Sequence, residues 1–292
     1  MLQSLYRDVN KALSVVYDQY EARAVAFMLL ESLLHVSRVD ILSDKDITFS
    51  SLQRNQLQGM LDRLVKHEPV QYVLGVADFC GLALEVGPGV LIPRPETEEL
   101  VQWICDDLKG VISPTIVDVC TGSGCIALAL SHRFSGACVL ATDLSEAALE
   151  VARRNACRLS LPVTFRQADA LGENPFGDGV GAISPMFDVV VSNPPYIRQC
   201  ERADMDANVL DYEPEQALFV PDNSPLLFYE AIARAALVRL KPGGALYFEI
   251  NRSFGQQILA MLSSIGFTAP ELRSDAYGNP RMVKATAPIR PN

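Results

Sequence analysis

Long apolar runs are missing from this sequence of 292 residues, although 49% of the residues are hydrophobic. A membrane-spanning helix needs roughly 20 consecutive apolar residues, and no stretch approaches that length. The opening segment MLQSLYRDVNKALSVV has neither the basic start nor the uninterrupted apolar stretch of a secretion signal. We therefore expect a soluble, cytoplasmic protein with no membrane partner.

Metal-ligating residues are also sparse. His35, His67 and His132 lie far apart, and the seven cysteines are scattered without a CxxC spacing. Structural zinc sites usually bring two such ligands close together in sequence, and disulfide frameworks belong to small secreted proteins. We expect reduced cysteines and no metal site.

Basic residues are outnumbered, with 25 Lys and Arg against 35 Asp and Glu and a formal net charge of −10. A protein that grips a phosphate backbone over a long footprint draws its affinity from lysine and arginine. Residues 1–75 carry 8 basic and 9 acidic side chains, so nearly all of the acidic excess lies downstream. Direct binding to DNA is not expected.

Residues 1–75 have a helical period instead. Apolar side chains recur every three or four positions from Leu5 to Tyr20, and EARAVAFMLLESLL continues the same spacing. Ser50 or Ser51 can cap a further helix. This segment predicts a small helical bundle, which we treat as a first domain.

The spacing of apolar residues changes over residues 76–93. LALEV alternates apolar and other side chains, GPG at 87–89 is a turn signal, and VLIP returns as an apolar run. Alternation on both sides of a turn is typical of a β-hairpin. We expect a hairpin linker here, between the bundle and a larger domain over residues 94–292.

Residues 94–292 alternate short apolar runs with helical stretches. This alternation is typical of a doubly wound α/β fold with a parallel sheet. Ligands of such sheets bind at the carboxyl ends of the strands, so motifs are sought there. The expected strands are Ile116–Val119, Cys138–Thr142, Val163–Arg166, Phe187–Ser192 and Ala245–Ile250.

The first motif is VDVCTGSGCIALAL, in which a strand runs into a glycine-containing loop and then a helix. Glycines let a backbone pass close to a ligand at a helix N-terminus, although a tight strand-to-helix turn alone needs the same residues. Later strands extend the pattern and favour a ligand. The loop residues are Cys120, Thr121, Gly122, Ser123 and Gly124.

Acidic residues end the next two strands. Asp143 can accept both hydroxyls of a ribose, and Ser145 is better placed than Asp143 to cap the following helix. Asp169 and Ala170 end the third strand, where adenine is expected, although Asp169 is almost as plausible as a surface loop acid. No phosphate-binding loop occurs and the dinucleotide fingerprint lacks one glycine. An adenosine-bearing cofactor without a pyrophosphate fits, and S-adenosylmethionine is the obvious candidate.

The fourth strand, VVVSNPPYI, ends in an amide, two prolines and an aromatic ring. The side-chain oxygen of Asn193 and the carbonyl of Pro194 can each accept a hydrogen bond from an N–H group of a planar nitrogen. These two hydrogen bonds would draw the nitrogen toward tetrahedral geometry as it attacks a methyl group. Pro195 helps to fix the backbone, and Tyr196 can stack on the planar group. A Pro-Pro loop with a turn-capping asparagine is the simpler reading, but the position after a fourth strand favours chemistry.

The two motifs together resemble a class I methyltransferase acting on a planar nitrogen. The segment EPVQYVLGVADFCGLALEVGPGVLIPRPETEELV is similar to the HemK/PrmC family, and further similarity lies in DYEPEQAL, LKPGGALYFEI and DAYGNPRMV. The resemblance covers nearly the whole chain. It implies a Rossmann-like, seven-stranded methyltransferase domain and methylation of the glutamine in the Gly-Gly-Gln loop of class I peptide chain release factors.

The resemblance also implies residue roles. The cofactor residues fall on the 120–124 loop, Asp143, Ala170 and Asn193, and the substrate amide falls on Asn193 through Tyr196. Family members usually have glycine where Cys120 stands, and many have an aromatic residue where Ala170 stands. A side chain beside the methionine moiety and weaker adenine packing are therefore expected.

Three alternatives remain open. Adenine-specific DNA methyltransferases share the Asn-Pro-Pro-Tyr motif, but they must also flip a base and read DNA, and this chain lacks a basic excess. A glutamine methyltransferase of a ribosomal protein is the second alternative, against which PRPETE favours the release-factor branch. A binding module without activity is the third, and the complete transfer motif disfavours it.

Overall fold

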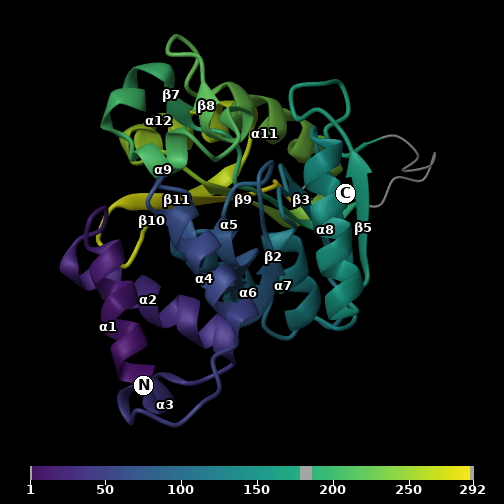
Figure 1. The fold of residues 1–292 in the computed structure, drawn as a ribbon. Helices are drawn as coiled ribbons and strands as arrows, with labels where there is room; N and C mark the ends of the chain where they lie inside the picture. The colour runs from purple at the N-terminus through teal and green to yellow at the C-terminus, as the bar shows by residue number, and fades with distance from the viewer. Residues whose placement is uncertain (1, 178–185, 290–292) are drawn as a thin grey trace. The chain divides into compact units, whose positions relative to one another are not determined.

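The computed structural model describes residues 2–177 and 186–289, which form two compact units (Figure 1). The helical unit consists of Met1–Val76 together with Asp206–Tyr212. The sheet unit consists of Ala77–Met205 and Glu213–Asn292. A short segment from late in the chain thus belongs to the unit that is otherwise N-terminal.

The helical unit packs its helices around an apolar core that includes Leu13, Leu29 and Leu64, each with no exposed side-chain surface. The hydroxyl of Tyr212 donates to the carbonyl of Lys66 at 2.8 Å and ties the late segment to this unit. The helices are α1 (Leu2–Leu13), α2 (Gln19–Leu34), α3 (Arg38–Leu42), α4 (Ser51–Leu64), α5 (Val70–Leu74) and α9 (Ala207–Leu210).

Local capping decides where these helices begin. The side chain of Asp18 accepts from the N–H groups of Tyr20 and Glu21, so α2 begins after a break and Tyr20 is 81% exposed. The apolar spacing up to Tyr20 therefore does not continue as one buried face. Ser50 caps α4 as expected, in a reciprocal capping box with Gln53.

The predicted hairpin is present but uses different strands. β1 (Val76–Phe79) pairs with β2 (Leu82–Glu85) across a turn at Cys80 and Gly81, both in the left-handed region. The turn expected at residues 87–89 is present, since the N–H of Val90 donates to the carbonyl of Gly87 at 3.3 Å. The expected return strand VLIP was wrong, because residues 86–94 form no strand. The N–H of Ile92 donates to a Glu213 carboxylate oxygen instead of a strand partner.

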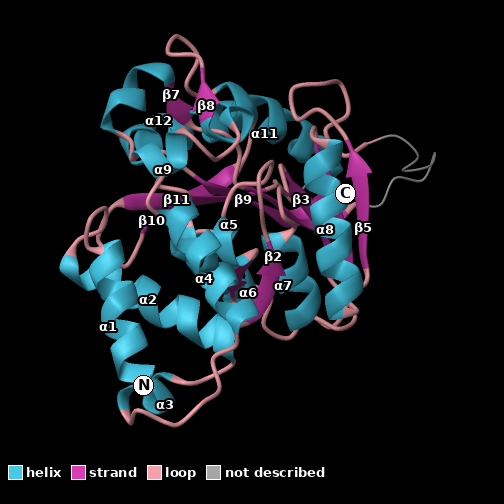
Figure 2. Cartoon of the chain, in the orientation of Figure 1, coloured by secondary structure: helices cyan, strands magenta, loops and turns pink. Residues whose placement is uncertain are grey.

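A seven-stranded sheet forms the centre of the sheet unit (Figure 2). The strands lie in the order β10-β11-β9-β6-β3-β4-β5, in which β5, β4, β3, β6 and β9 are parallel and the β11 and β10 pairings are antiparallel. This confirms the predicted α/β class. The strands are β3 (Thr115–Val119), β4 (Cys138–Asp143), β5 (Val163–Gln167), β6 (Phe187–Ser192), β9 (Leu240–Glu249), β10 (Thr268–Ser274) and β11 (Pro280–Thr286).

Helices cover both faces of the sheet. Successive residues of each strand point to opposite faces, so each strand contributes apolar side chains to two cores. Ile116 and Val189 pack in one core with α6, α7 and α8, whereas Val117 and Val190 pack in the other with α11 and α12. The helices are α6 (Pro95–Asp107), α7 (Cys125–Arg133), α8 (Glu146–Leu159), α11 (Leu227–Arg239) and α12 (Gly255–Ile265).

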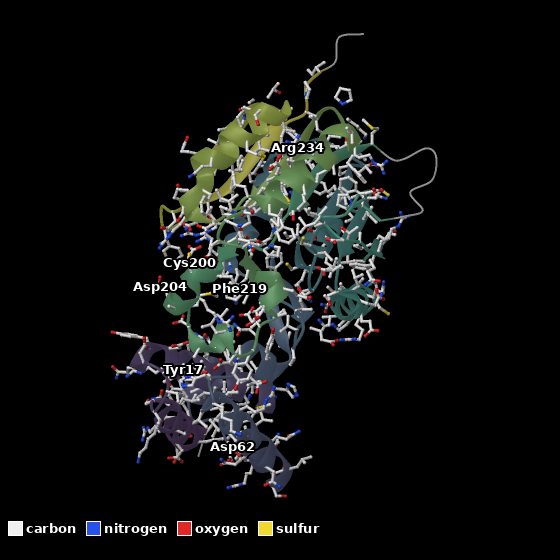
Figure 3. The ribbon with its side chains drawn as sticks, turned by 90° about the horizontal axis from the view of Figure 1, so that it is seen from above. Tyr17, Asp62, Cys200, Asp204, Phe219 and Arg234 are labelled. Carbon is white, nitrogen blue, oxygen red and sulfur yellow. The ribbon has the colours of Figure 1, made fainter. Side chains whose placement is uncertain are left out.

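Short elements follow β6, and two of them, β7 and β8, form a separate two-stranded sheet. β7 and β8 form a parallel pair in which Ile197 lies opposite Phe219. Cys200 and Phe219, labelled in Figure 3, lie near the start and end of the excursion between these strands. The elements are β7 (Ile197–Arg198), η1 (Gln199–Asp204), α10 (Glu215–Leu218) and β8 (Phe219–Val220), and η2 (Arg252–Phe254) follows β9.

Candidate active site

A pocket opens where the central strands end. In the register of the parallel strands, Val119 of β3 lies beside Thr142 of β4 and Ser192 of β6, so the residues that follow them meet at one edge of the sheet. The hydroxyl of Ser192 donates to the carbonyl of Val119 at 2.5 Å and fixes this edge. The pocket is lined by Gly89, Val90, Leu91, Cys120, Gly122, Asp143, Leu144, Ser145, Ala148, Asp169, Ala170, Leu171, Asn193, Pro195, Pro214, Gln216, Ala217 and Phe228.

The loop after β3 contributes Cys120 and Gly122 to this lining. Cys120 has φ = 63° and Gly122 has φ = 56°. A left-handed backbone costs a residue with a Cβ roughly 1–2 kcal/mol, so Cys120 occupies a position suited to glycine. Burial raises the pKa of the Cys120 thiol, so the thiol stays protonated.

Asp143 ties that loop to the end of β4. One carboxylate oxygen accepts from the N–H of Gly122 at 2.8 Å, and the other accepts from the N–H of Ser145 at 2.9 Å. The hydroxyl of Ser145 accepts from the N–H of Ala148 and caps α8, as the sequence predicts. Burial raises the pKa of Asp143 from its usual value, whereas its three main-chain N–H partners oppose that shift.

Asp118, inside β3, supports the loop from below. Its side chain has no exposed surface, and one oxygen accepts from the Thr121 hydroxyl at 2.5 Å and the Ala127 N–H at 3.2 Å. Burial raises the pKa of this carboxyl to about 7. Its other oxygen has no hydrogen-bond partner among the described residues.

The residues after β5 form another wall. Ala170 is buried and lines the pocket, next to Leu171. Asp169 is exposed and also lines it, while one of its oxygens accepts from the N–H of Leu171 at 2.8 Å. Both predicted residues therefore lie at the pocket, and Asp169 also forms the local turn.

The Asn-Pro-Pro-Tyr segment follows β6 directly. Asn193 and Pro195 line the pocket, while Pro194 is buried and not part of the lining. The Nδ2 atom of Asn193 donates to the hydroxyl of Thr97 at 3.3 Å. The hydroxyl of Tyr196 donates to Glu249 at 3.0 Å, so this ring is fixed from outside the pocket lining.

Two flanking segments are joined beside the pocket by Glu213, whose side chain is 1% exposed. One oxygen accepts from the N–H of Ile92 at 3.0 Å and the other accepts from the Arg94 guanidinium at 2.5 Å. Gly89–Leu91 precede these partners, and Pro214–Ala217 follow Glu213 in sequence. Glu213 thereby holds together two stretches that both line the pocket.

Three predicted loop residues do not line the pocket. Thr121 is buried and its hydroxyl donates to Asp118. Ser123 is buried, and its carbonyl accepts from the side chain of Asn155. A Cβ on Gly124 would come within 3.1 Å of Ala152, so this glycine lets the loop and α8 approach closely.

Sequence reasoning missed Thr97, Glu249, Glu213 and Asp118 as functional residues. Asp118 carried a usable signal, because it is an acid inside an otherwise apolar strand. Thr97 and Glu249 are 152 positions apart, and neither follows one of the predicted strand ends around the pocket. Glu249 carried the same signal as Asp118, because it is an acid in the predicted strand Ala245–Ile250. Thr97 is marked only by its burial against Glu249.

Neither a metal-binding cluster nor a membrane-spanning helix is found in the described residues. Residues 2–177 and 186–289 contain no group of three or more His, Cys, Asp or Glu that could hold a metal ion. In the same ranges no helix is both long and apolar enough to span a membrane.

Comparison with known proteins gives consistent matches. Residues 5–75 match the family "PrmC N-terminal domain", and residues 116–210 match "Methyltransferase domain". The release factor glutamine methyltransferase of Bacteroides thetaiotaomicron is 42% identical over 277 residues, covering 95% of this chain and 97% of that protein. The protein of the same name from Streptococcus pneumoniae is 36% identical, covering 90% and 91%.

Solved structures with the same fold are more distant in sequence. A T. thermophilus 16S rRNA N2 methyltransferase, RsmC, in complex with AdoMet and guanosine has a TM-score of 0.52 at 19% identity, covering 73% of this chain and 49% of that one. A methyltransferase from Pyrococcus furiosus has a TM-score of 0.50 at 20% identity, covering 80% and 100%. These likenesses show the fold.

Proposed function

Because this chain belongs to the release factor glutamine methyltransferase family, we propose that it methylates the glutamine of the Gly-Gly-Gln loop in class I peptide chain release factors. The methyl group comes from S-adenosylmethionine and is attached to the side-chain amide nitrogen. The proposed enzyme is cytoplasmic and acts in translation termination. The observation that carries the proposal is the position of Asn193 at the edge of a pocket formed by the ends of β3, β4 and β6.

The composition of the pocket supports this cofactor. Among the described residues that line it, none is lysine or arginine, whereas Asp143 and Asp169 are acidic. Such a lining suits a cationic sulfonium and gives a pyrophosphate no positive partner. S-adenosylmethionine, when bound, supplies an electrophilic methyl group. We propose that Asp143 holds its ribose hydroxyls and that Ala170 and Phe228 pack against its adenine.

The amide of the substrate needs help because its nitrogen lone pair is delocalised. We propose that the Oδ1 atom of Asn193 and the carbonyl of Pro194 each accept a hydrogen bond from one N–H group of the substrate amide. These hydrogen bonds hold the nitrogen in line with the methyl group. Pro195 keeps this backbone rigid, and Tyr196 supports the planar group. As the N–C bond forms and the S–C bond breaks, the nitrogen becomes acidic and gives its proton to water.

Binding of a whole protein requires more contact area than one glutamine can provide. We propose that residues 1–75 recognise the release factor, that residues 76–93 link them to the catalytic part, and that residues 94–292 carry out the transfer. The match of residues 5–75 to the PrmC N-terminal domain supports this division. Among the described residues of the helical unit, six large apolar side chains are at least 41% exposed: Val15, Tyr20, Val39, Leu42, Leu52 and Val65.

Two other substrates deserve direct comparison, namely adenine in DNA and a glutamine of a ribosomal protein. The net charge of −10 disfavours the first, and family membership disfavours both. Purified enzyme with radiolabelled S-adenosylmethionine should label a class I release factor and leave duplex DNA and ribosomal proteins unlabelled. Preferential labelling of either alternative would refute the proposed substrate.

A further inference from the structure

A buried carboxylate that the transfer chemistry does not use lies behind Asn193. Glu249 ends β9 and is 1% exposed. Its Oε2 atom accepts from the Thr97 hydroxyl at 2.5 Å, and its Oε1 atom accepts from the Tyr196 hydroxyl at 3.0 Å. Thr97 lies in the first turn of α6 and is itself 1% exposed. One carboxylate thus holds two hydroxyls that flank the proposed transfer site.

The hydroxyl of Thr97 has a single hydrogen, which it gives to Glu249. Toward Asn193 it can therefore only accept, and the Nδ2 atom of Asn193 donates to it at 3.3 Å. The amide of Asn193 is planar and has two ends. With Nδ2 directed to Thr97, Oδ1 is the end left for another donor.

We infer that Thr97 and Glu249 are positioning residues that select the orientation of the Asn193 amide, so that its oxygen faces the substrate nitrogen. This inference rests on the proposed function. A flipped amide would place N–H groups of Asn193 against N–H groups of the substrate glutamine. The acceptor that holds the reacting nitrogen would then be lost, while the side chain kept its place and volume.

Burial raises the pKa of Glu249, and Glu96 raises it too. The Thr97 and Tyr196 hydroxyls and Arg281 act in the opposite direction and favour the ionised, accepting carboxylate. Arg281 is held in turn by Asp275, with 3.5 Å between the Nε and Oδ2 atoms. Tyr196 donates to Glu249 rather than competing for Thr97. The direction of each hydrogen bond is therefore set: Asn193 donates to Thr97, and Thr97 donates to Glu249.

The first test compares Thr97→Val with Thr97→Ser. Valine keeps the shape of threonine but removes the hydroxyl, whereas serine keeps the hydroxyl. We expect Thr97→Val to lower kcat on release factor by about 10- to 100-fold, with the Kd for S-adenosylmethionine and the KM for release factor within about 3-fold of wild type. Thr97→Ser should retain kcat within about 3-fold. A purely structural role would not separate kcat from both binding constants.

A second variant keeps the inference testable if Thr97→Val does not fold. Glu249→Gln preserves volume, but its single amide oxygen cannot hold Thr97 and Tyr196 as the carboxylate does. We expect kcat to fall about 10-fold with cofactor affinity retained. If either variant folds, binds S-adenosylmethionine and turns over within 2-fold of wild type, the positioning role is refuted.

The same assays separate this inference from the function on which it rests. A wild-type enzyme that fails to methylate release factor refutes the proposed function. An active wild type together with an equally active Thr97→Val variant leaves that function standing and refutes only the positioning role.

Discussion

Asn193 is the residue whose replacement has the largest expected effect on turnover. Asn193→Ala removes the side-chain acceptor for the substrate nitrogen and should lower kcat by roughly 10²- to 10³-fold, the range for losing one preorganised polar contact in a transition state. Methyl transfer to release factor measures this effect, with calorimetry of S-adenosylmethionine binding as the check on folding. Asn193→Asp keeps an acceptor but adds charge, so it should also lose turnover while still binding the cofactor. Near-normal turnover of Asn193→Ala would exclude the proposed role.

Cys120 tests the backbone of the same site. Alanine is ordinarily better than glycine by about 0.5–1 kcal/mol, but a left-handed φ penalises any Cβ by roughly 1–2 kcal/mol. At φ = 63°, we therefore expect Cys120→Gly to be more stable than Cys120→Ala, by at most about 1.5 kcal/mol. Urea unfolding of the two variants gives the comparison, since both lose the same thiol. A more stable alanine variant would show that the loop relaxes to negative φ.

At the scale of elements, Glu213 joins the segments before α6 and at α10. Glu213→Gln removes the charge that pairs with Arg94 and weakens the bond to the Ile92 N–H. Hydrogen bonds to charged groups contribute roughly 1.5–3 kcal/mol, so the Kd for S-adenosylmethionine should rise about 10-fold as the two segments separate.

The control for that variant is Glu215, the first residue of α10, two positions after Glu213. Glu215 pairs with Arg202 but is 61% exposed, and surface ion pairs contribute little. Glu215→Gln should change the cofactor Kd less than 2-fold. Equal effects of the two variants in calorimetry would mean that Glu213 holds no pocket segment in place.

The elements also show what a sequence can predict and what it cannot. The central strands were predicted because strands buried on both faces need short, continuous apolar runs. The loops after β3, β4, β5 and β6 could be assigned to one site because parallel strands end at one edge. VLIP is an apolar run of the same kind but forms no strand. The N–H of Ile92 donates instead to Glu213, 121 positions away. Thr97 was missed for the same reason, since its hydrogen bond to Glu249, 152 positions away, leaves no local pattern.

At the scale of the whole molecule, Asp118 links stability to pH. Its pKa is about 7 in the folded protein and near 3.9 when unfolded. Between these values the folded state binds a proton that the unfolded chain has released. The contribution of this group to the free energy of unfolding is therefore present at low pH and lost as pH rises toward 7 and above.

Asp118→Asn removes this titration. The free energy of unfolding of the variant, minus that of wild type, should increase by on the order of a few kcal/mol between pH 5 and pH 8. Shifts shared by both proteins, such as that of Glu249, cancel in the difference. Urea unfolding at the two pH values measures it. A difference that does not change with pH would mean that Asp118 does not titrate in this range.

Mass spectrometry of a class I release factor after incubation with the enzyme and S-adenosylmethionine tests the central claim most directly. Fragmentation of the digested product should locate one added methyl group on the glutamine side chain of the Gly-Gly-Gln peptide. The same reaction with Asn193→Ala should leave that peptide almost unmodified. An unmodified peptide after reaction with the folded, cofactor-binding wild type, or a methyl group on another residue, would contradict the account.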